Sequence, residues 1–278
     1  MNERMKVLIG YDGSSCADGA LLDLRRAGLP QTVEAVVMCM ADVLMPPQMP
    51  PGPGIDEPLF PPALPEAARK AWARALRAIK EAEALAKQAA ERLQTYFPTW
   101  KIHAEARADS PAWGLVKKAD EWKPDLLVVG SHGRSALGRL ILGSVSQKVL
   151  TEARCSVCIA RGRMDAQDGP LRIVVGVDGS ADADTAVRGV TRRVWPAGSE
   201  ALVLTAVDRM LASMAQQPQI SGKDEWAWPR QVVEGAAEAL RAAGLVVSSR
   251  VAEADPKRLL PAEAEAWEPT ASSSGPEA

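Results

Sequence analysis

The sequence predicts an α/β fold, in which a doubly wound, parallel five-stranded sheet carries helices on both faces and is repeated once in incomplete form. Two observations predict this fold class. Short apolar runs alternate with longer segments of helical composition, as strands and helices do in βαβ units. In addition, "KVLIGYDGSSCADGAL" (6–21) and "RIVVGVDGSADADTAV" (172–187) share one pattern, in which an apolar run is followed by G-x-D-G-S and small helix formers.

The first copy supplies every element of a complete sheet. The segment 6–21 begins as a strand and continues as a helix, and "AVVMCMAD" (35–42) is the second strand. The Pro-rich segment 45–66 cannot form regular structure and is expected to be a long loop. The segment 67–97 is rich in Ala, Leu, Lys and Glu with apolar residues at helical spacing, so it predicts a long helix.

The remaining elements of the first copy continue in βαβ order. Residues 101–109 alternate as a strand, and 110–122 open with a Ser-Pro helix signal. The run 125–130 is continuously apolar, which is typical of a strand buried on both faces. A helix over 144–153 and a strand over 155–160 complete the set. The carboxyl ends of such strands form the ligand-binding edge, and here they carry Asp12, Asp42 and Gly130.

The second copy contains fewer elements. We expect strands at 171–177, 201–207 and 245–253 and helices at about 182–194, 225–243 and 256–266. Trp267-Glu268-Pro269 then corresponds to Trp122-Lys123-Pro124, and the chain ends in a Ser/Gly/Pro tail without a fourth strand, glycine loop, last helix or fifth strand. The predicted organisation is a complete domain over 1–163, an incomplete one over 170–269 and a disordered tail over 270–278.

Composition excludes several classes of protein. The 278 residues are 47% hydrophobic and 24% charged with a formal net charge of −2, so the basic excess of a nucleic-acid or anionic-membrane binder is absent. No apolar run approaches the ~20 residues that span a bilayer. The start "MNERMKVLIG" does not resemble a signal peptide, and we therefore expect a cytoplasmic location.

Cys155 and Cys158 form a C-x-x-C motif, which can be a thiol redox pair or half of a zinc site. The alternative is a short buried strand. The sequence has no second C-x-x-C, and its only histidines are His103 and His132, so the buried strand is favoured.

The segment 128–150 carries the pattern G-x2-G-x9-G-S through Gly130, Gly133, Gly143 and Ser144. Glycines let main-chain N–H groups approach an anion closely, and a helix N-terminus adds its positive dipole end. Ser144 can cap the helix and donate its hydroxyl to a phosphate oxygen. The spacing recurs at Gly176, Gly179 and Gly189, but that last glycine falls inside a predicted helix, so the context favours the first match.

On these residues the chain resembles the universal stress protein family, in its nucleotide-binding branch. "GSHGRSALGRLILGS" is similar to the phosphate loop of that branch, and "IGYDGS" and "VGVDGS" are similar to the family's first strand and turn. The resemblance covers 5–161 as a complete domain and 171–269 as the first three strands of another. It implies the strand order 3-2-1-4-5 and adenine nucleotide binding, with ATP as cofactor and Mg or Mn on the phosphates.

The resemblance also implies roles for single residues. Asp12 would face the ribose or the phosphate-bound divalent cation, Met40 the adenine edge through its backbone, and Ala41 would leave space for the ring. Val129 and Gly130 would border the ribose. The triphosphate would lie on Gly133, Gly143, Ser144, Val145 and Ser146, with Gly10 and Tyr11 counted in the same site. Arg134 is added on electrostatic grounds.

Binding of ATP is better supported by the sequence than rapid hydrolysis. The loop ends in GS, so no Walker lysine comes after it, and no water-activating carboxylate lies nearby in sequence. His132 is interpreted as an exposed or ligand-packing residue and not as a general base. The leading interpretation is an ATP-binding stress-response regulator or sensor. A slow ATPase or phosphotransferase, and a partner-binding module with a vestigial nucleotide site, stay as alternatives.

The incomplete second copy leads to two further expectations. It offers Asp178 and Asp208 at strand ends but no phosphate loop, so one nucleotide per chain is expected. In the order 3-2-1-4-5 its first strand would also be a bare apolar edge, which invites pairing. We expect this edge to be covered within a homodimer or within an intramolecular domain pair.

Overall fold

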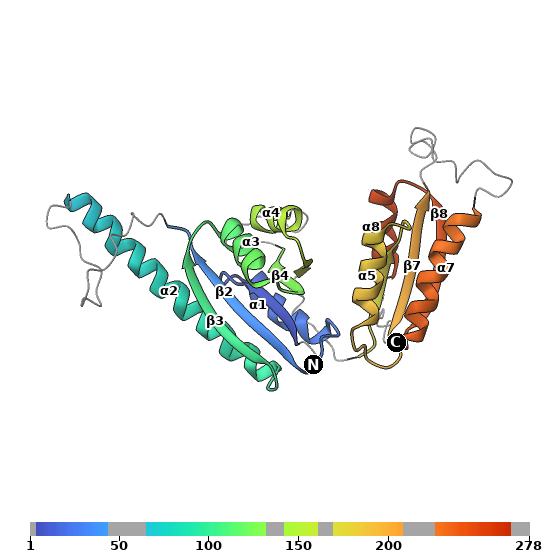
Figure 1. Ribbon diagram of the computed structural model, residues 1–278, viewed down its shortest axis with the longest axis horizontal. Helices are drawn as coiled ribbons and strands as arrows, with labels where there is room; N and C mark the ends of the chain where they lie inside the picture. Colours follow the sequence, from blue (N-terminus) through green and yellow to red (C-terminus); the bar gives the residue numbers. More distant parts are fainter. Residues whose placement is uncertain (1–3, 44–64, 132–141, 161–168, 208–225, 268–278) are drawn as a thin grey trace, which may run out of the picture. The chain divides into compact units, whose positions relative to one another are not determined.

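The computed structural model describes residues 4–43, 65–131, 142–160, 169–207 and 226–267. These residues fall into two compact units that divide after Ala166 (Figure 1). The Pro-rich segment up to residue 64 and the tail 270–278 lie outside the described residues. No helix among those described is both long enough and apolar enough to cross a membrane.

The first unit is built on a five-stranded parallel sheet in the order β3-β2-β1-β4-β5. This order confirms the predicted doubly wound fold. The strands are β1 (Met5–Gly10), β2 (Val33–Ala41), β3 (Lys101–Ala108), β4 (Leu126–Gly130) and β5 (Ser156–Ala160). Because β1 lies between β2 and β4, the crossovers leave it in opposite directions, which creates the switch point where ligands of such sheets bind.

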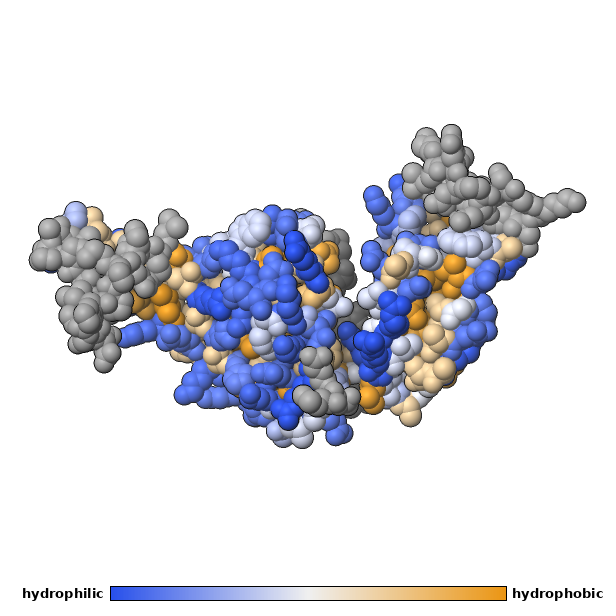
Figure 2. Space-filling view, in the orientation of Figure 1, coloured by the Kyte–Doolittle hydropathy of each residue, from blue (hydrophilic) through white to orange (hydrophobic). Residues whose placement is uncertain are grey.

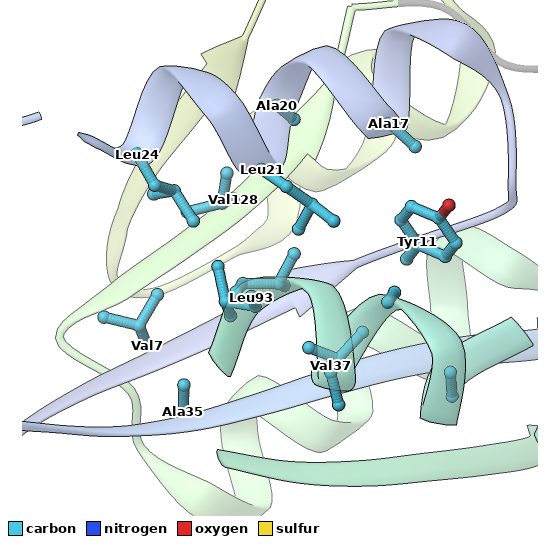
Figure 3. Close-up of a cluster of buried hydrophobic side chains, with 14 of the residues drawn as sticks. Val7, Tyr11, Ala17, Ala20, Leu21, Leu24, Ala35, Val37, Leu93 and Val128 are labelled. Carbon is cyan, nitrogen blue, oxygen red and sulfur yellow. The ribbon is translucent and has the colours of Figure 1, made fainter. Parts of the chain in front are cut away.

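Helices cover both faces of this sheet (Figure 1). They are α1 (Ser15–Asp23), the 3₁₀ turn η1 (Leu24–Arg26), α2 (Glu66–Tyr96), α3 (Pro111–Trp122) and α4 (Ser144–Glu152). Alternate residues of β1 face alternate layers: Val7 and Ile9 pack with α1 and α2, whereas Leu8 packs with α3 and α4. Figure 3 shows the first of these clusters, with Leu21 of α1 and Leu24 of η1 facing Leu93 of α2.

The second unit repeats the first three strands of that plan. Among the described residues, its parallel sheet has three strands in the order β6-β7-β8. The elements are β6 (Arg172–Gly176), α5 (Ala181–Thr191), β7 (Glu200–Val207), α7 (Ala227–Ala242), β8 (Val246–Glu253) and α8 (Pro256–Trp267). The core packs against α5 and α7, and α8 contributes no buried residue.

The G-x-D-G-S turns of the two units have the same backbone conformation. Gly13 and Gly179 both have φ of 76°, in the left-handed region that favours glycine. Ser14 and Ser180 both have φ −77° and ψ 160° and cap the following helix. The repeat predicted from the sequence is therefore a repeat of local geometry as well.

Candidate functional site

The carboxyl ends of β1, β2 and β4 lie at one edge of the first sheet, because all of its strands are parallel. The Asp12 turn comes directly after β1, Met40 and Ala41 end β2, and Gly130 ends β4. Helix α4 begins shortly after this edge at Ser144. The fold thus brings most of the predicted site residues to one edge. Gly133 and Arg134, like His132, lie outside the described residues.

The turn after β1 presents one carboxylate to solvent. Asp12 is exposed, and its Oδ1 accepts a hydrogen bond from the Ser14 N–H at 3.0 Å. The Ser14 hydroxyl in turn accepts from the Ala17 N–H at 3.2 Å, which starts α1. This leaves Oδ2 of Asp12 for another ligand, and an exposed carboxylate oxygen suits a divalent cation that phosphates also hold.

Tyr11 turns its side chain away from this turn and into the core (Figure 3). Its ring is buried, its hydroxyl donates to Asp18 Oδ1 at 2.6 Å, and Arg92 of α2 pairs with the same oxygen. Burial and then the bond to Asp18 raise the pKa of Tyr11 to about 12. The Tyr11 N–H donates to the Met38 carbonyl at 2.9 Å. Only the Tyr11 carbonyl is left to take part in the predicted site.

The end of β2 offers main-chain groups at the same edge. The Ala41 carbonyl accepts from the Asp109 N–H on the β3 side, whereas the Met38 carbonyl accepts from Tyr11 on the β1 side. Because main-chain groups alternate in direction along a strand, the N–H and C=O of Met40 point to the same side as those of Met38, toward β1. Gly10, the last residue of β1, pairs with Met38, so Met40 lies beyond the end of β1. The Met40 side chain instead packs on α3, where a Cβ at Gly114 would lie 2.5 Å from its Cε.

Gly130 lies where β4 passes closest to the start of α1. A Cβ at this position would lie 3.1 Å from the Cys16 carbonyl carbon and 3.2 Å from the Ala17 nitrogen, closer than side chains ordinarily approach. Val129 before it is 3% exposed and belongs to the core, so its side chain does not face the edge. Glycine at 130 is therefore explained by close packing in addition to any ligand contact.

Two hydrogen bonds hold the N-terminus of α4 at the end of β4. The Gly143 N–H donates to the Ser131 carbonyl at 2.8 Å, and the buried Ser146 hydroxyl donates to the Gly130 carbonyl at 2.6 Å. Both residues were predicted to bind a triphosphate, largely through their main chain; the Gly143 N–H is engaged within the protein, whereas the Ser146 bond uses the hydroxyl and not the N–H. Ser131 is a residue that sequence reasoning missed, although it lies inside the glycine loop.

Three main-chain donors remain at this helix start. The first intrahelical bond runs from the Gln147 N–H to the Gly143 carbonyl at 2.9 Å, and Gly143 has no side chain with which to cap the helix. Within the described part of the chain, the N–H groups of Ser144, Val145 and Ser146 have no acceptor. Such donors, with the helix dipole behind them, bind an anion.

The second unit places a tryptophan ring against the corresponding turn. Asp178 Oδ1 accepts from the Ser180 N–H at 3.0 Å, and Ser180, through its side chain and then its N–H, holds the pKa of Asp178 below its usual value. A Cβ at Gly179 would lie 2.6 Å from the Trp228 ring of α7, so that ring covers the turn. Asp208 lies outside the described residues.

The two cysteines of the C-x-x-C motif lie on opposite faces of the first sheet. Cys155 packs with the cluster under α3 and α4, and Cys158 packs with the cluster under α1 and α2. Neither cysteine is part of a disulfide, and burial raises the pKa of Cys155. The arrangement is that of a half-buried edge strand, less buried than the sequence predicted, and not of a facing redox pair. No group of three or more metal-ligating side chains gathers among the residues with described positions.

Comparison with known proteins identifies relatives of this chain. A universal stress protein of Methanocaldococcus jannaschii is 39% identical over 61 residues, which is 22% of this chain and 36% of that protein. The chain spans about a quarter to a third of the length of the first curated relatives that it matches.

A solved structure shows the same fold. The universal stress protein of Archaeoglobus fulgidus DSM 4304 is 16% identical, has a TM-score of 0.59, and is matched over 94% of this chain and 83% of its own. A family member from Arabidopsis thaliana, solved with AMP bound, is 16% identical with a TM-score of 0.36 over 59% of this chain and 97% of its own. The model of the universal stress protein family matches residues 3–161 and 171–271, one stretch in each unit. The chain belongs to the universal stress protein family.

Proposed function

We propose that the first unit binds an adenine nucleotide, ATP with Mg or Mn, at the carboxyl edge of its sheet, and that the protein acts through this binding as a stress-response regulator or sensor. The observation that carries the proposal is the start of α4. Three N–H groups without an acceptor in the described chain, those of Ser144, Val145 and Ser146, lie just beyond the end of β4. A polyphosphate supplies the acceptors that they need.

The other residues at the edge have complementary roles in this proposal. The main chain of Met40 meets the adenine edge, while Ala41 leaves room for the ring. Gly130 borders the ribose, and the free oxygen of Asp12 contacts the divalent cation. The bonds from Gly143 and Ser146 to Ser131 and Gly130 hold the α4 donors in place, which reduces the entropy cost of ordering them when the phosphates bind.

A proline at the first helical position tests the role of the main chain. Ser144→Pro removes one N–H but keeps the helix, because proline is favoured there and Gly143, with ψ of 154°, already has the conformation that precedes proline. We expect calorimetric titration of the full chain with MgATP to show about 10- to 100-fold weaker binding, the effect of one lost hydrogen bond to a charged group.

Two matched variants complete this experiment. Ser144→Ala keeps the N–H and removes only the hydroxyl, so it separates the two donors of this residue and should weaken binding less than Ser144→Pro. Ala181→Pro makes the same change at the first position of α5 in the second unit and should leave binding unaltered. Absence of binding to ATP, ADP and AMP at millimolar concentration would refute the proposed function. Unchanged affinity of Ser144→Pro would refute the phosphate site.

A further inference from the structure

Strand β6 has one neighbour where its counterpart in the first unit has two. Within the part of the second unit that the structure describes, β6 pairs with β7 alone, from Arg172 opposite Glu200 to Gly176 opposite Leu204. The corresponding strand β1 pairs with β2 on one side and, through Val7–Ile9, with β4 on the other. The first unit thus shows that a strand of this type accepts a partner on the side that β6 leaves open.

The hydrogen-bonding groups on this open edge can be assigned from the register. The Val177 N–H donates to the Leu204 carbonyl at 2.9 Å, so alternation turns Val175 and Ile173 toward β7 as well. The N–H and C=O groups of Arg172, Val174 and Gly176 must then face the open edge. The first unit supports this assignment, because the carbonyl of Lys6, the counterpart of Arg172, accepts from the Asp125 N–H on the β4 side at 2.9 Å.

This edge lacks the charges that usually prevent strands from pairing. Arg172 is the only charged residue of β6, and its side chain is held within its own unit. Its Nε lies 3.4 Å from Glu200 Oε2, and its guanidinium donates to the Trp267 carbonyl at 2.9 Å. Val174 is partly exposed, whereas its counterpart Leu8 is fully buried. Apolar side chains are also visible on the surface of the second unit in Figure 2.

We propose that two copies of this chain associate by antiparallel pairing of their β6 strands about a twofold axis at Val174. In this register Val174 faces Val174, Ile173 faces Val175, and Arg172 faces Gly176. The three residues whose main-chain groups line the open edge are then the three hydrogen-bonded pairs of the ladder. The result is one continuous six-stranded sheet formed from two second units.

The sequence of β6 favours a second copy over another partner, because the strand is complementary to itself. A twofold axis makes each contact occur twice, so a contact between like charges would destabilise the dimer at two places. Here the only charge faces a glycine, and every other pair is apolar. The axis also keeps the two α8 helices on one face of the joined sheet. On that face each α8, which has no buried residue of its own, packs beside the α8 of the other copy, as α3 packs beside α4 in the first unit.

Sedimentation velocity of the full chain over a range of concentrations tests this interface. We expect a monomer–dimer equilibrium in which Val174→Lys raises the dissociation constant at least about tenfold, since two lysines would meet at the axis. Val246→Lys is the matched control. Val246 is 62% exposed on β8, the opposite edge of the same sheet, and its replacement should leave the equilibrium unaltered.

A cysteine pair gives a second readout that does not depend on disruption. Hydrogen-bonded antiparallel partners have Cα atoms about 5.5 Å apart, within the range that a disulfide spans. Val174→Cys should therefore form a covalent dimer on mild oxidation, and Val246→Cys should not exceed the background of the four native cysteines. The proposal is overturned by a chain that stays monomeric at every concentration, by a dimer insensitive to Val174→Lys, or by equal crosslinking of the two cysteine variants.

Discussion

At the residue scale, Tyr11 shows how a side chain beside the candidate site can serve the fold. It joins three elements, because its hydroxyl binds Asp18 of α1 and the same carboxylate pairs with Arg92 of α2. The sequence contained a signal for this. Tyr11 continues the alternation of Val7 and Ile9, and all three belong to the cluster beneath α1 and α2. This alternation places the Tyr11 side chain in the core, so only its main chain can belong to the predicted site.

The pKa of Tyr11 makes stability dependent on pH in the alkaline range. The folded pKa is about 12 and the usual value is 10.0, so the folded state binds the proton more tightly. The contribution of Tyr11 is fully present below pH 10 and should be lost as the pH rises from 10 to 12. The free energy of unfolding, measured with denaturant at each pH, should fall across this window.

Tyr11→Phe is the control for this prediction, because phenylalanine keeps the ring and cannot ionise. The difference between the unfolding free energies of the two chains should be constant below pH 10 and shrink above it. A late phase in the ultraviolet titration of tyrosinate should also disappear in the variant. A difference that stays constant up to pH 12 would contradict the raised pKa.

At the element scale, hydrophobic periodicity was sufficient to predict the strands and helices, which agree with the structure within a few residues. The runs 35–42 and 125–130 are mostly apolar, which predicts buried strands, and the structure has strands at Val33–Ala41 and Leu126–Gly130. Glycine spacing likewise located the start of α4. It could not show that the Gly143 N–H is bound to Ser131, because that bond depends on how α4 docks on β4.

The docking of α4 on β4 depends on one buried hydroxyl. Ser146 is 3% exposed and donates to the Gly130 carbonyl, so Ser146→Ala should lower the free energy of unfolding of the first unit by about 1 kcal/mol. Amide hydrogen exchange in β4, measured by mass spectrometry, would show the loss. Ser144→Ala removes an exposed hydroxyl from the same helix and should have no effect. Equal exchange in both variants would mean that the bond does not stabilise the docking.

At the scale of the whole molecule, the two units differ in what they place at the carboxyl edge. The first combines the Asp12 turn with the start of α4, whereas the second places the Trp228 ring against its own turn. Where the second unit is described, its sheet holds β6, β7 and β8 and no counterpart of β4. The glycine spacing assigned the phosphate loop to the first copy, whereas the position of Trp228 depends on tertiary packing, which no sequence pattern revealed.

This difference predicts the stoichiometry of binding. We expect titration of the full chain with MgATP to saturate at a single nucleotide per chain. Ser144→Pro should weaken that one event. Trp228→Ala, which uncovers the turn of the second unit, should add no second event, because the described part of that unit has no counterpart of the α4 donors. Two equivalent sites in the original chain would contradict the assignment of the site to the first unit.

The strand order has a kinetic consequence. In the second unit, the Leu171 N–H donates to the Ser199 hydroxyl next to the pairing of β6 with β7, and these two residues are 28 apart in the sequence. In the first unit, the pairing of β1 with β4 joins Lys6 and Asp125 across 119 residues. Closing the longer loop costs about 1 kcal/mol more in chain entropy, and such distant pairings slow folding. The proposed nucleotide edge is thus created by the most remote strand pairing described in the chain, and we expect folding to complete it late.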